Sequence, residues 1–183
     1  MKILPTLLAF LILSSYLLGA PKKNIVDTAI EAGNFSTLVA AVRKADLFGT
    51  LKGDGPFTVF APTDEAFKKF WPETLKNLLK PENKDKLQLL LTYHVVSEKI
   101  KSKKAMKLNS VQPISGGSLK LAYKSNALRV NHAKIIKADI RTTNGIIHVI
   151  DAVLVPNVSK KTATVRSPSS FSDSTNNGLA SSN

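Results

Sequence analysis

The spacing of apolar residues changes once along this chain, and that change limits the folds it can adopt. Before Lys107, apolar residues recur every three or four positions, in stripes such as Ile25, Val26, Ala29 and Ile30. After Lys107 they alternate with polar residues, which is typical of strands with one buried face. Helices followed by a run of antiparallel strands predict the α+β class.

Turn and capping signals divide the first half into short helices. Gly33 is predicted to end one helix, and Asp46 and Thr63 are each predicted to cap the start of another. The helix at residues 82–95 is hydrophobic almost all round, so we expect it to be central and buried. The other helices are predicted within 24–45 (two), at 47–51, after Thr63 and at 72–79.

Turn dipeptides also separate the predicted strands. Ser125-Asn126 and Asn144-Gly145 are read as tight turns, and Asn144-Gly145 is expected to need a positive φ. Gly116-Gly117 marks a further turn. The strands are predicted at residues 57–61, 111–114, 119–123, 128–131, 135–140 and 146–155.

Both ends of the chain differ in composition from the part between them. Residues 1–20 resemble a secretory signal peptide, with an uncleaved anchor as the alternative because Pro21 follows the expected cleavage site. Residues 159–183 are rich in Ser, Thr and Asn and are predicted to be a disordered tail. We therefore expect one folded domain at 24–158, exported to the periplasm, cell surface or extracellular space as a monomer. The chain has no cysteine, so packing and hydrogen bonds must stabilise it.

The chain is strongly basic, with a formal net charge of +13. Such a charge favours anionic partners, here an acidic polysaccharide or an anionic lipid surface. Specific nucleic-acid binding is disfavoured, because no helix interleaves arginines with aromatic residues. Lysines cluster between the helices and the strands, where they form either a solvated segment or a binding patch: Lys99, Lys101, Lys103, Lys104 and Lys107.

Three motifs together resemble the fasciclin family of adhesion domains. They are FTVFAPTDEAF at 57–67, YHVV at 93–96 and TNGIIHVIDAVLVP at 143–156, in the family's order and spacing. The resemblance implies two β-sheets in a wedge or sandwich, with helices packed around one edge. It also implies adhesion to matrix or cell-surface proteins. Read from the residues alone, the first and third motifs are mainly architectural.

The same resemblance implies contact residues. Similar domains bind receptors through an Asp-Ile pair and a Tyr-His segment, which match Asp139, Ile140, Tyr93 and His94 here. Arg141 departs from the apolar residue usual after the pair. Each position also has a structural interpretation: Asp139 accepts hydrogen bonds from the turn that follows it, and His94 is a buried imidazole that ties the central helix to the strand region.

The sequence also bears on functions other than adhesion. Enzyme activity is disfavoured, because the three histidines are scattered and no nucleophile elbow or phosphate loop occurs. No cofactor or metal is expected. The alternatives are a structural role in the cell envelope, or carriage of a small apolar ligand in a gap lined by aromatic residues: Phe67, Phe70, Trp71 and Tyr123.

Overall fold

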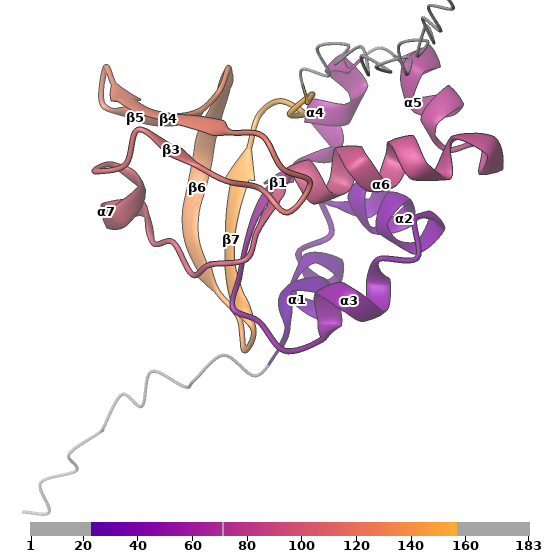
Figure 1. Ribbon diagram of the computed structural model, residues 1–183, viewed down its shortest axis with the longest axis horizontal. Coiled ribbons are helices and arrows are strands. Elements are labelled where there is room, and N and C mark those ends of the chain that lie inside the picture. Colours follow the sequence, from indigo (N-terminus) through magenta and orange to yellow (C-terminus); the bar gives the residue numbers. More distant parts are fainter. Residues whose placement is uncertain (1–22, 71, 157–183) are drawn as a thin grey trace, which may run out of the picture.

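A computed structural model describes residues 23–70 and 72–156 of the chain. The predicted signal peptide and tail, and Trp71, lie outside these residues. Helices dominate the first half, as the apolar period predicts (Figure 1). The helices are α1 (Ile25–Ala32), α2 (Ser36–Lys44), α3 (Phe48–Lys52), α4 (Asp64–Lys69), α5 (Pro72–Leu78), α6 (Lys84–Tyr93) and α7 (Ser102–Ala105), with a 3-10 turn η1 (Pro81–Asn83).

Strands dominate the second half, which confirms the α+β class. They form one hydrogen-bonded series in the order β2-β1-β7-β6-β5-β4-β3. The first and last long strands, β1 and β7, pair in parallel as the second and third strands of this series, and the other pairs are antiparallel. The strands are β1 (Phe57–Pro62), β2 (Val95–Val96), β3 (Ser110–Val111), β4 (Leu119–Lys124), β5 (Ala127–Val130), β6 (Ala133–Arg141) and β7 (Gly145–Ile150).

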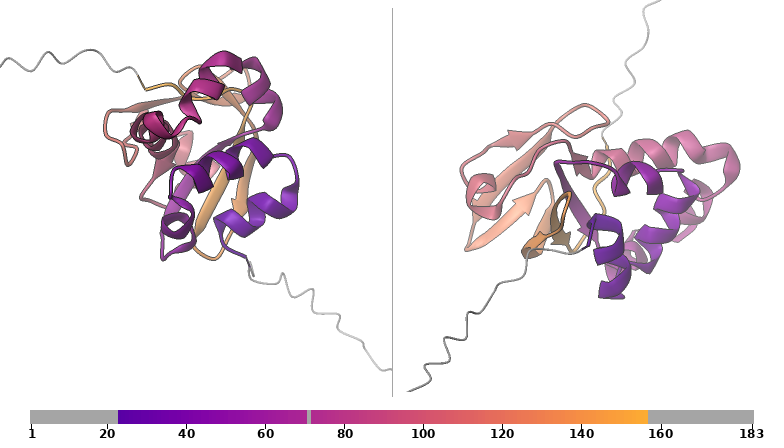
Figure 2. Two further views of the ribbon diagram at one scale, coloured as in Figure 1. Left: turned by 90° about the vertical axis from the view of Figure 1, so that its right-hand side faces the viewer. Right: turned by 90° about the horizontal axis from the view of Figure 1, so that it is seen from below.

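The strands β1 and β7 separate two apolar clusters. Side chains such as Val59 and Ile147 face the helices, whereas Phe60 and Ile150 face a second cluster enclosed by β3 to β6. Figures 1 and 2 show the helices α1 to α6 on one side of β1 and β7, and the strands β4 and β5 with α7 on the other. Because both faces are covered, all six residues of β7 are buried. This explains why four of its six residues are Ile or Val.

The strand β6 is irregular, and this lets the sheet serve both clusters. Its pairing with β7 shifts register between Ile135 and Lys137 and again between Lys137 and Ile140. Asp139, within the second shift, has a φ of 59°. As a result Ile135 packs into the cluster under β4 and β5, whereas Ile140 packs against the helical cluster. Bulges of this kind bend a strand and increase its twist.

Two capping predictions are confirmed and one is wrong. Gly33 ends α1 with a φ of 73°, and Thr63 accepts a hydrogen bond from the Ala66 N–H at 3.2 Å. Asp46 does not cap α3; its φ is 56° and its carboxylate pairs with Lys84 of α6. The chain reverses direction at Asp46, in a left-handed conformation that Asp tolerates, and this turns the carboxylate away from α3.

Four further expectations need correction. The helix α6 is not buried all round, since Leu89 is 37% exposed and Lys86 is exposed on its outer side. The predicted strand at 111–114 reduces to Ser110–Val111, and the one at 146–155 ends at Ile150. The Asn144-Gly145 turn has no positive φ. Gly145 is needed for a different reason: a Cβ there would collide with the Phe57 carbonyl and lie 2.8 Å from Ile25 Cδ1.

Candidate functional site

Three neighbouring strands each bind the same short segment, residues 98–102, which we call the strap. Thr58 of β1 donates to the Glu98 carbonyl and accepts from the Ile100 N–H at 2.8 Å. On β7, His148 Nε2 lies 2.8 Å from the Ile100 carbonyl. On β6, Asp139 accepts from the Ser102 N–H at 2.8 Å and from its hydroxyl. The strap therefore crosses β1, β7 and β6 in order.

His148 is the central contact of the strap. It is fully buried, and Phe60 stacks on it with ring centroids 5.7 Å apart. The Asp139 N–H donates to Nδ1 at 3.3 Å, so Nε2 carries the proton and donates to the Ile100 carbonyl. Burial lowers the pKa of His148. A neutral imidazole thus joins β7, β6 and the strap.

Asp139 is held by the strap rather than presented to solvent. Partial burial acts to raise the pKa of Asp139, but hydrogen bonds from Ser102 outweigh it and the pKa is lowered. The expectation that Asp139 accepts from the following turn is wrong. Its left-handed backbone in the β6 bulge directs the carboxylate to Ser102 instead. Ile140, half-buried, packs against the helical cluster.

His94 is a buried link between α6 and the chain after β7. It is 2% exposed; its Nδ1 lies 2.8 Å from the Leu90 carbonyl, and its Nε2 accepts from the Leu154 N–H at 2.9 Å. Burial lowers the pKa of His94 to about 4. These contacts are the tie that the structural interpretation of His94 expects.

Tyr93 points to a different part of the fold from Asp139. Its hydroxyl donates to the Ser118 carbonyl at 3.0 Å and accepts from Asn131 Nδ2 at 3.3 Å. Within the described residues no hydrogen bond joins the Tyr-His pair to Asp139 or Ile140. The structure therefore does not unite the four positions in one contact site.

An open groove of about 840 Å³ lies beside Tyr93. We call it the Tyr93 groove; it runs between the end of α6, the loop from β3 to β4, and the outer side of β4. The loop is fixed to the end of α6 and to β2, because the Ser115 N–H donates to the Thr92 carbonyl at 3.4 Å and the Ile114 N–H to the Val95 carbonyl at 2.8 Å. The groove is lined by Leu89, Tyr93, Ser115, Gly116, Gly117, Ser118, Lys120, Ala122, Asn131, His132, Val155 and Pro156.

The gap between helices and sheet is too small for a carried ligand. An apolar cavity lies there, but its volume is about 30 Å³, against roughly 300–1,000 Å³ for small-molecule pockets. Of the aromatic residues expected to line it, Trp71 lies outside the described residues and the other three are elsewhere: Phe67 is buried in the helical cluster, Phe70 packs against that cluster, and Tyr123 is 49% exposed on β4. Among residues 23–70 and 72–156, no cluster of three acidic or histidine side chains is arranged to hold a metal ion. In that same part of the chain, every helix is too short or too polar to cross a membrane.

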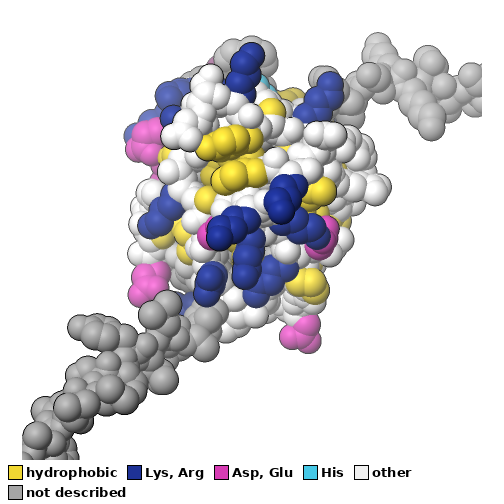
Figure 3. Space-filling view, turned by 90° about the vertical axis from the view of Figure 1, so that its left-hand side faces the viewer, with side chains coloured by type: hydrophobic (Ala, Val, Ile, Leu, Met, Phe, Trp, Pro, Cys, Tyr) yellow, Lys and Arg dark blue, Asp and Glu magenta, His cyan; other side chains and the backbone are white. Residues whose placement is uncertain are grey.

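Positive charge is concentrated in the strand half of the domain. Residues 99–141 contain 11 lysines and arginines and one acidic residue, Asp139, whereas residues 24–98 contain 9 basic and 10 acidic residues. Lys101, Lys103 and Lys104 are exposed on or beside α7, where the strap places them next to β6; Lys104 pairs with Glu98. Figure 3 shows lysine and arginine side chains gathered on this face, beside a hydrophobic patch.

The sequence interpretation missed the contribution of the strands to this charge. Lys120, Lys124, Arg129 and Lys134 alternate with buried residues along β4, β5 and β6 and are exposed. The twofold period after Lys107 places them all on one outer face. Reading the charges along with the apolar positions would have located this patch.

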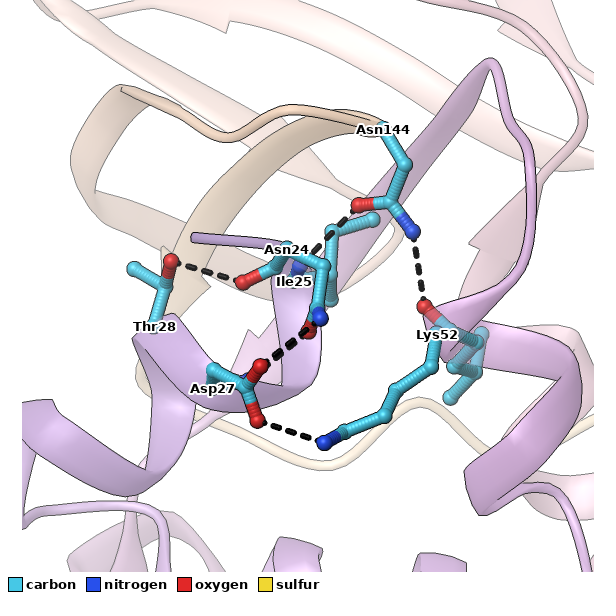
Figure 4. A network of polar contacts seen from close by, with 7 residues as sticks. Asn24, Ile25, Asp27, Thr28, Lys52 and Asn144 are labelled. Atoms are coloured by element: carbon cyan, nitrogen blue, oxygen red, sulfur yellow. Dashed lines mark hydrogen bonds and ion pairs between the residues drawn. The ribbon is translucent and has the colours of Figure 1, made fainter. Parts of the chain in front are cut away.

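The third motif fixes the start of the domain to its end. Asn144 Oδ1 accepts from the Ile25 N–H at 3.0 Å, and Nδ2 donates to the Leu51 and Gly53 carbonyls at 2.9 and 2.8 Å. Figure 4 shows this junction beside the Asp27–Lys52 ion pair of 2.8 Å. Asn144 thus serves as an architectural residue that joins α1, α3 and the β6–β7 turn.

Comparison with known proteins agrees with the three motifs. The family model for the Fasciclin domain matches residues 33–156. Protein sll1483 of Synechocystis is 41% identical over 179 residues, covering 85% of this chain and 99% of that protein. Rabbit transforming growth factor-beta-induced protein ig-h3 is 36% identical over 140 residues, covering 76% of this chain and 20% of that protein.

A solved structure supports the fold. The FAS1 domain pair of fasciclin I, an insect cell adhesion molecule, matches with a TM-score of 0.68 at 18% identity, covering 74% of this chain and 52% of that one. The chain belongs to the fasciclin domain family.

Proposed function

We propose that this protein is an exported, non-enzymatic adhesion domain that attaches, as a monomer, to an anionic polymer of a cell surface or matrix. The observation that carries the proposal is the segregation of charge, with 11 basic residues and one acidic residue between positions 99 and 141. Fasciclin I, which shares the fold, is a cell adhesion molecule. A basic face on one side of a domain attracts polyanions over about 10 Å at 0.1 M salt.

In this proposal the exposed lysines and arginines bind the polymer, whereas the residues that match receptor-binding positions of similar domains stabilise the fold. Tyr93, His94 and Asp139 already make hydrogen bonds inside the domain, so a partner that engaged them would have to replace those bonds. A single exposed ion pair contributes about 0–1 kcal/mol, so attachment needs many lysines acting together. Lys101, Lys103 and Lys104 are three of them.

A non-enzymatic role agrees with how the buried polar groups are used. Thr58, His94 and His148 each bind backbone groups with the side-chain atoms that a catalyst would need free. In the described residues, no buried side-chain nitrogen or oxygen lacks a hydrogen-bond partner.

Affinity chromatography on an acidic polysaccharide tests the proposal. We expect the full-length protein to bind heparin or alginate at low salt, and replacing Lys101, Lys103 and Lys104 by Gln to lower the salt concentration needed for elution. The matched control replaces Lys68, Lys69 and Lys80, exposed cations of the helical half, and removes the same net charge. Equal shifts for both variants, or no retention of the unmodified protein, would contradict a localised binding face.

A further inference from the structure

The outer face of β4, β5 and β6 carries unpaired positive charge. Apart from Tyr123, its inward side chains are buried, and its outward ones include four cations: Lys120, Lys124, Arg129 and Lys134. The acidic residue of these strands, Asp139, is bonded to Ser102. None of the ion pairs found in the described residues includes any of the four cations.

Two of these cations oppose each other directly. Arg129 pairs with Lys134 across β5 and β6, and Arg129 also lies opposite Ala122 of β4. Like charges at opposite positions of an antiparallel pair destabilise the sheet. The nearby Asp151 carboxylate accepts a hydrogen bond from the Lys134 backbone N–H at 2.8 Å. An anion bound across the row would relieve this repulsion.

The row of cations leads into the Tyr93 groove. Lys120 and Ala122 belong both to the outer face of β4 and to the groove wall. The base is rigid, because Asn131 accepts from the Lys120 N–H at 2.8 Å and donates to the Tyr93 hydroxyl. The volume of about 840 Å³ is that of a small-molecule site. Groove and row therefore form one continuous surface.

The lining chemistry fits an acidic sugar. Ser118 and His132 are exposed at the groove and offer hydrogen-bonding groups beside the Lys120 ammonium, which suits hydroxyls next to a carboxylate or sulfate. A flat bilayer cannot enter a concave groove. Nucleic-acid bases would need an exposed aromatic face in the groove to stack on, but Tyr93 is 7% exposed, and Tyr123, which is 49% exposed, does not line the groove.

We propose that the Tyr93 groove binds an acidic sugar unit of a linear polysaccharide, and that neighbouring units of the same chain cross Arg129 and Lys134. This inference rests on the proposed attachment to anionic polymers and names the polymer class and the subsite. It makes Lys120 the residue shared by the subsite and the row.

Amide chemical shifts during titration locate the site in the full-length protein. The probes are a heparin-derived tetrasaccharide, a tetragalacturonate and, as the neutral control, cellotetraose. We expect the acidic tetramers to shift Gly116, Gly117, Lys120 and His132, and cellotetraose to leave them unchanged. The sulfated and carboxylated probes separate the two sources of acidic groups. Shifts confined to α7, or equal shifts with a single-stranded DNA oligomer or phosphatidylglycerol vesicles, would overturn the assignment.

Substitutions separate the groove from the general charge. Ser118→Phe fills the groove without changing charge, and we expect about a tenfold loss of tetramer affinity (about 1.4 kcal/mol) with retention on polymeric heparin preserved. Gln112→Phe, exposed and outside the groove, is the control. Unchanged tetramer affinity in Ser118→Phe would refute the subsite while leaving the proposed function intact. If the unmodified protein were not retained on polymeric heparin, both proposals would be refuted.

Charge removal gives a second readout that does not depend on Ser118→Phe folding. Replacing Arg129 and Lys134 by Gln is expected to weaken tetramer binding about fivefold, since each exposed charge contributes up to about 1 kcal/mol. The same change should keep or raise the unfolding temperature at low salt, because the repulsion is gone. A lowered unfolding temperature with unchanged tetramer affinity would contradict the proposal.

Discussion

Lowering the pH should destabilise this domain through His94. The effect is expected between pH 6.5, the ordinary pKa of histidine, and about 4, the pKa of His94 in the folded protein. The unfolded chain binds a proton near the ordinary value of 6.5, whereas the folded imidazole does so only at about 4. Between these values the unfolded state holds more protons, so the free energy of unfolding falls as the pH falls. The contribution is complete above pH 6.5 and lost by pH 4, a difference of about 3 kcal/mol.

The variant that tests this reasoning is His94→Gln. Its amide oxygen can accept the Leu154 N–H, while the bond to the Leu90 carbonyl is lost, at a cost of about 1–3 kcal/mol at pH 7. Urea unfolding followed by far-ultraviolet circular dichroism at several pH values between 7 and 4 gives the slope. We expect the free energy of unfolding to depend less steeply on pH in the variant than in the unmodified protein, by up to about 1.4 kcal/mol per pH unit.

Two other groups bear on the same measurement. Burial also lowers the pKa of His148, so part of the slope remains in the variant. The carboxylates with lowered pKa values, Asp27, Asp64 and Asp139, begin to lose their contribution as the pH approaches 3.8, and this part of the slope is shared by the variant and the unmodified protein. The exposed His132→Gln is the control. Parallel slopes for His94→Gln and the unmodified protein would refute the argument.

Two substitutions test the architecture. Thr58→Val keeps the shape of the side chain but leaves the buried Ile100 N–H without a partner. We therefore expect the free energy of unfolding, measured in urea, to fall by about 1–3 kcal/mol. The control Thr92→Val, whose hydroxyl bonds only within its own helix, should change it little. Equal effects would remove the strap contact as a source of stability. Gly145→Ala should abolish soluble folded protein because its Cβ meets the Phe57 carbonyl, whereas Gly49→Ala, with open space around it, should be tolerated; a soluble, stable Gly145→Ala protein would contradict the close approach of β1 and β7.

Local patterns predicted the elements well where one interaction decides the outcome. The two-residue turn Ser125-Asn126 is positive in φ at both residues and joins β4 to β5, as expected. Thr63 caps α4 because its hydroxyl is three residues from the N–H that it accepts. Asp46 failed the same rule, since its conformation is set by the reversal between α2 and α3 and its carboxylate by Lys84, 38 residues away.

The candidate site shows the same division. The sequence placed His94 correctly on a buried face, because the leucines around it share a helical period. It did not reveal that Thr58, His148 and Asp139 bind one segment, because each belongs to a different strand and their meeting depends on the order β1-β7-β6. Nor did it show that Asp139 sits in a bulge, which is set by the register between β6 and β7.

The parallel pairing of β1 with β7 has a consequence for how the chain acquires its structure. Phe57 lies opposite Gly145, so this part of the sheet forms only when segments almost ninety residues apart meet. Contacts of such long sequence separation slow folding, because the entropy of closing the loop is lost before the pairing is gained. A chain still emerging from the ribosome lacks its final strand, so β1 cannot pair with β7 until synthesis of the domain is almost complete.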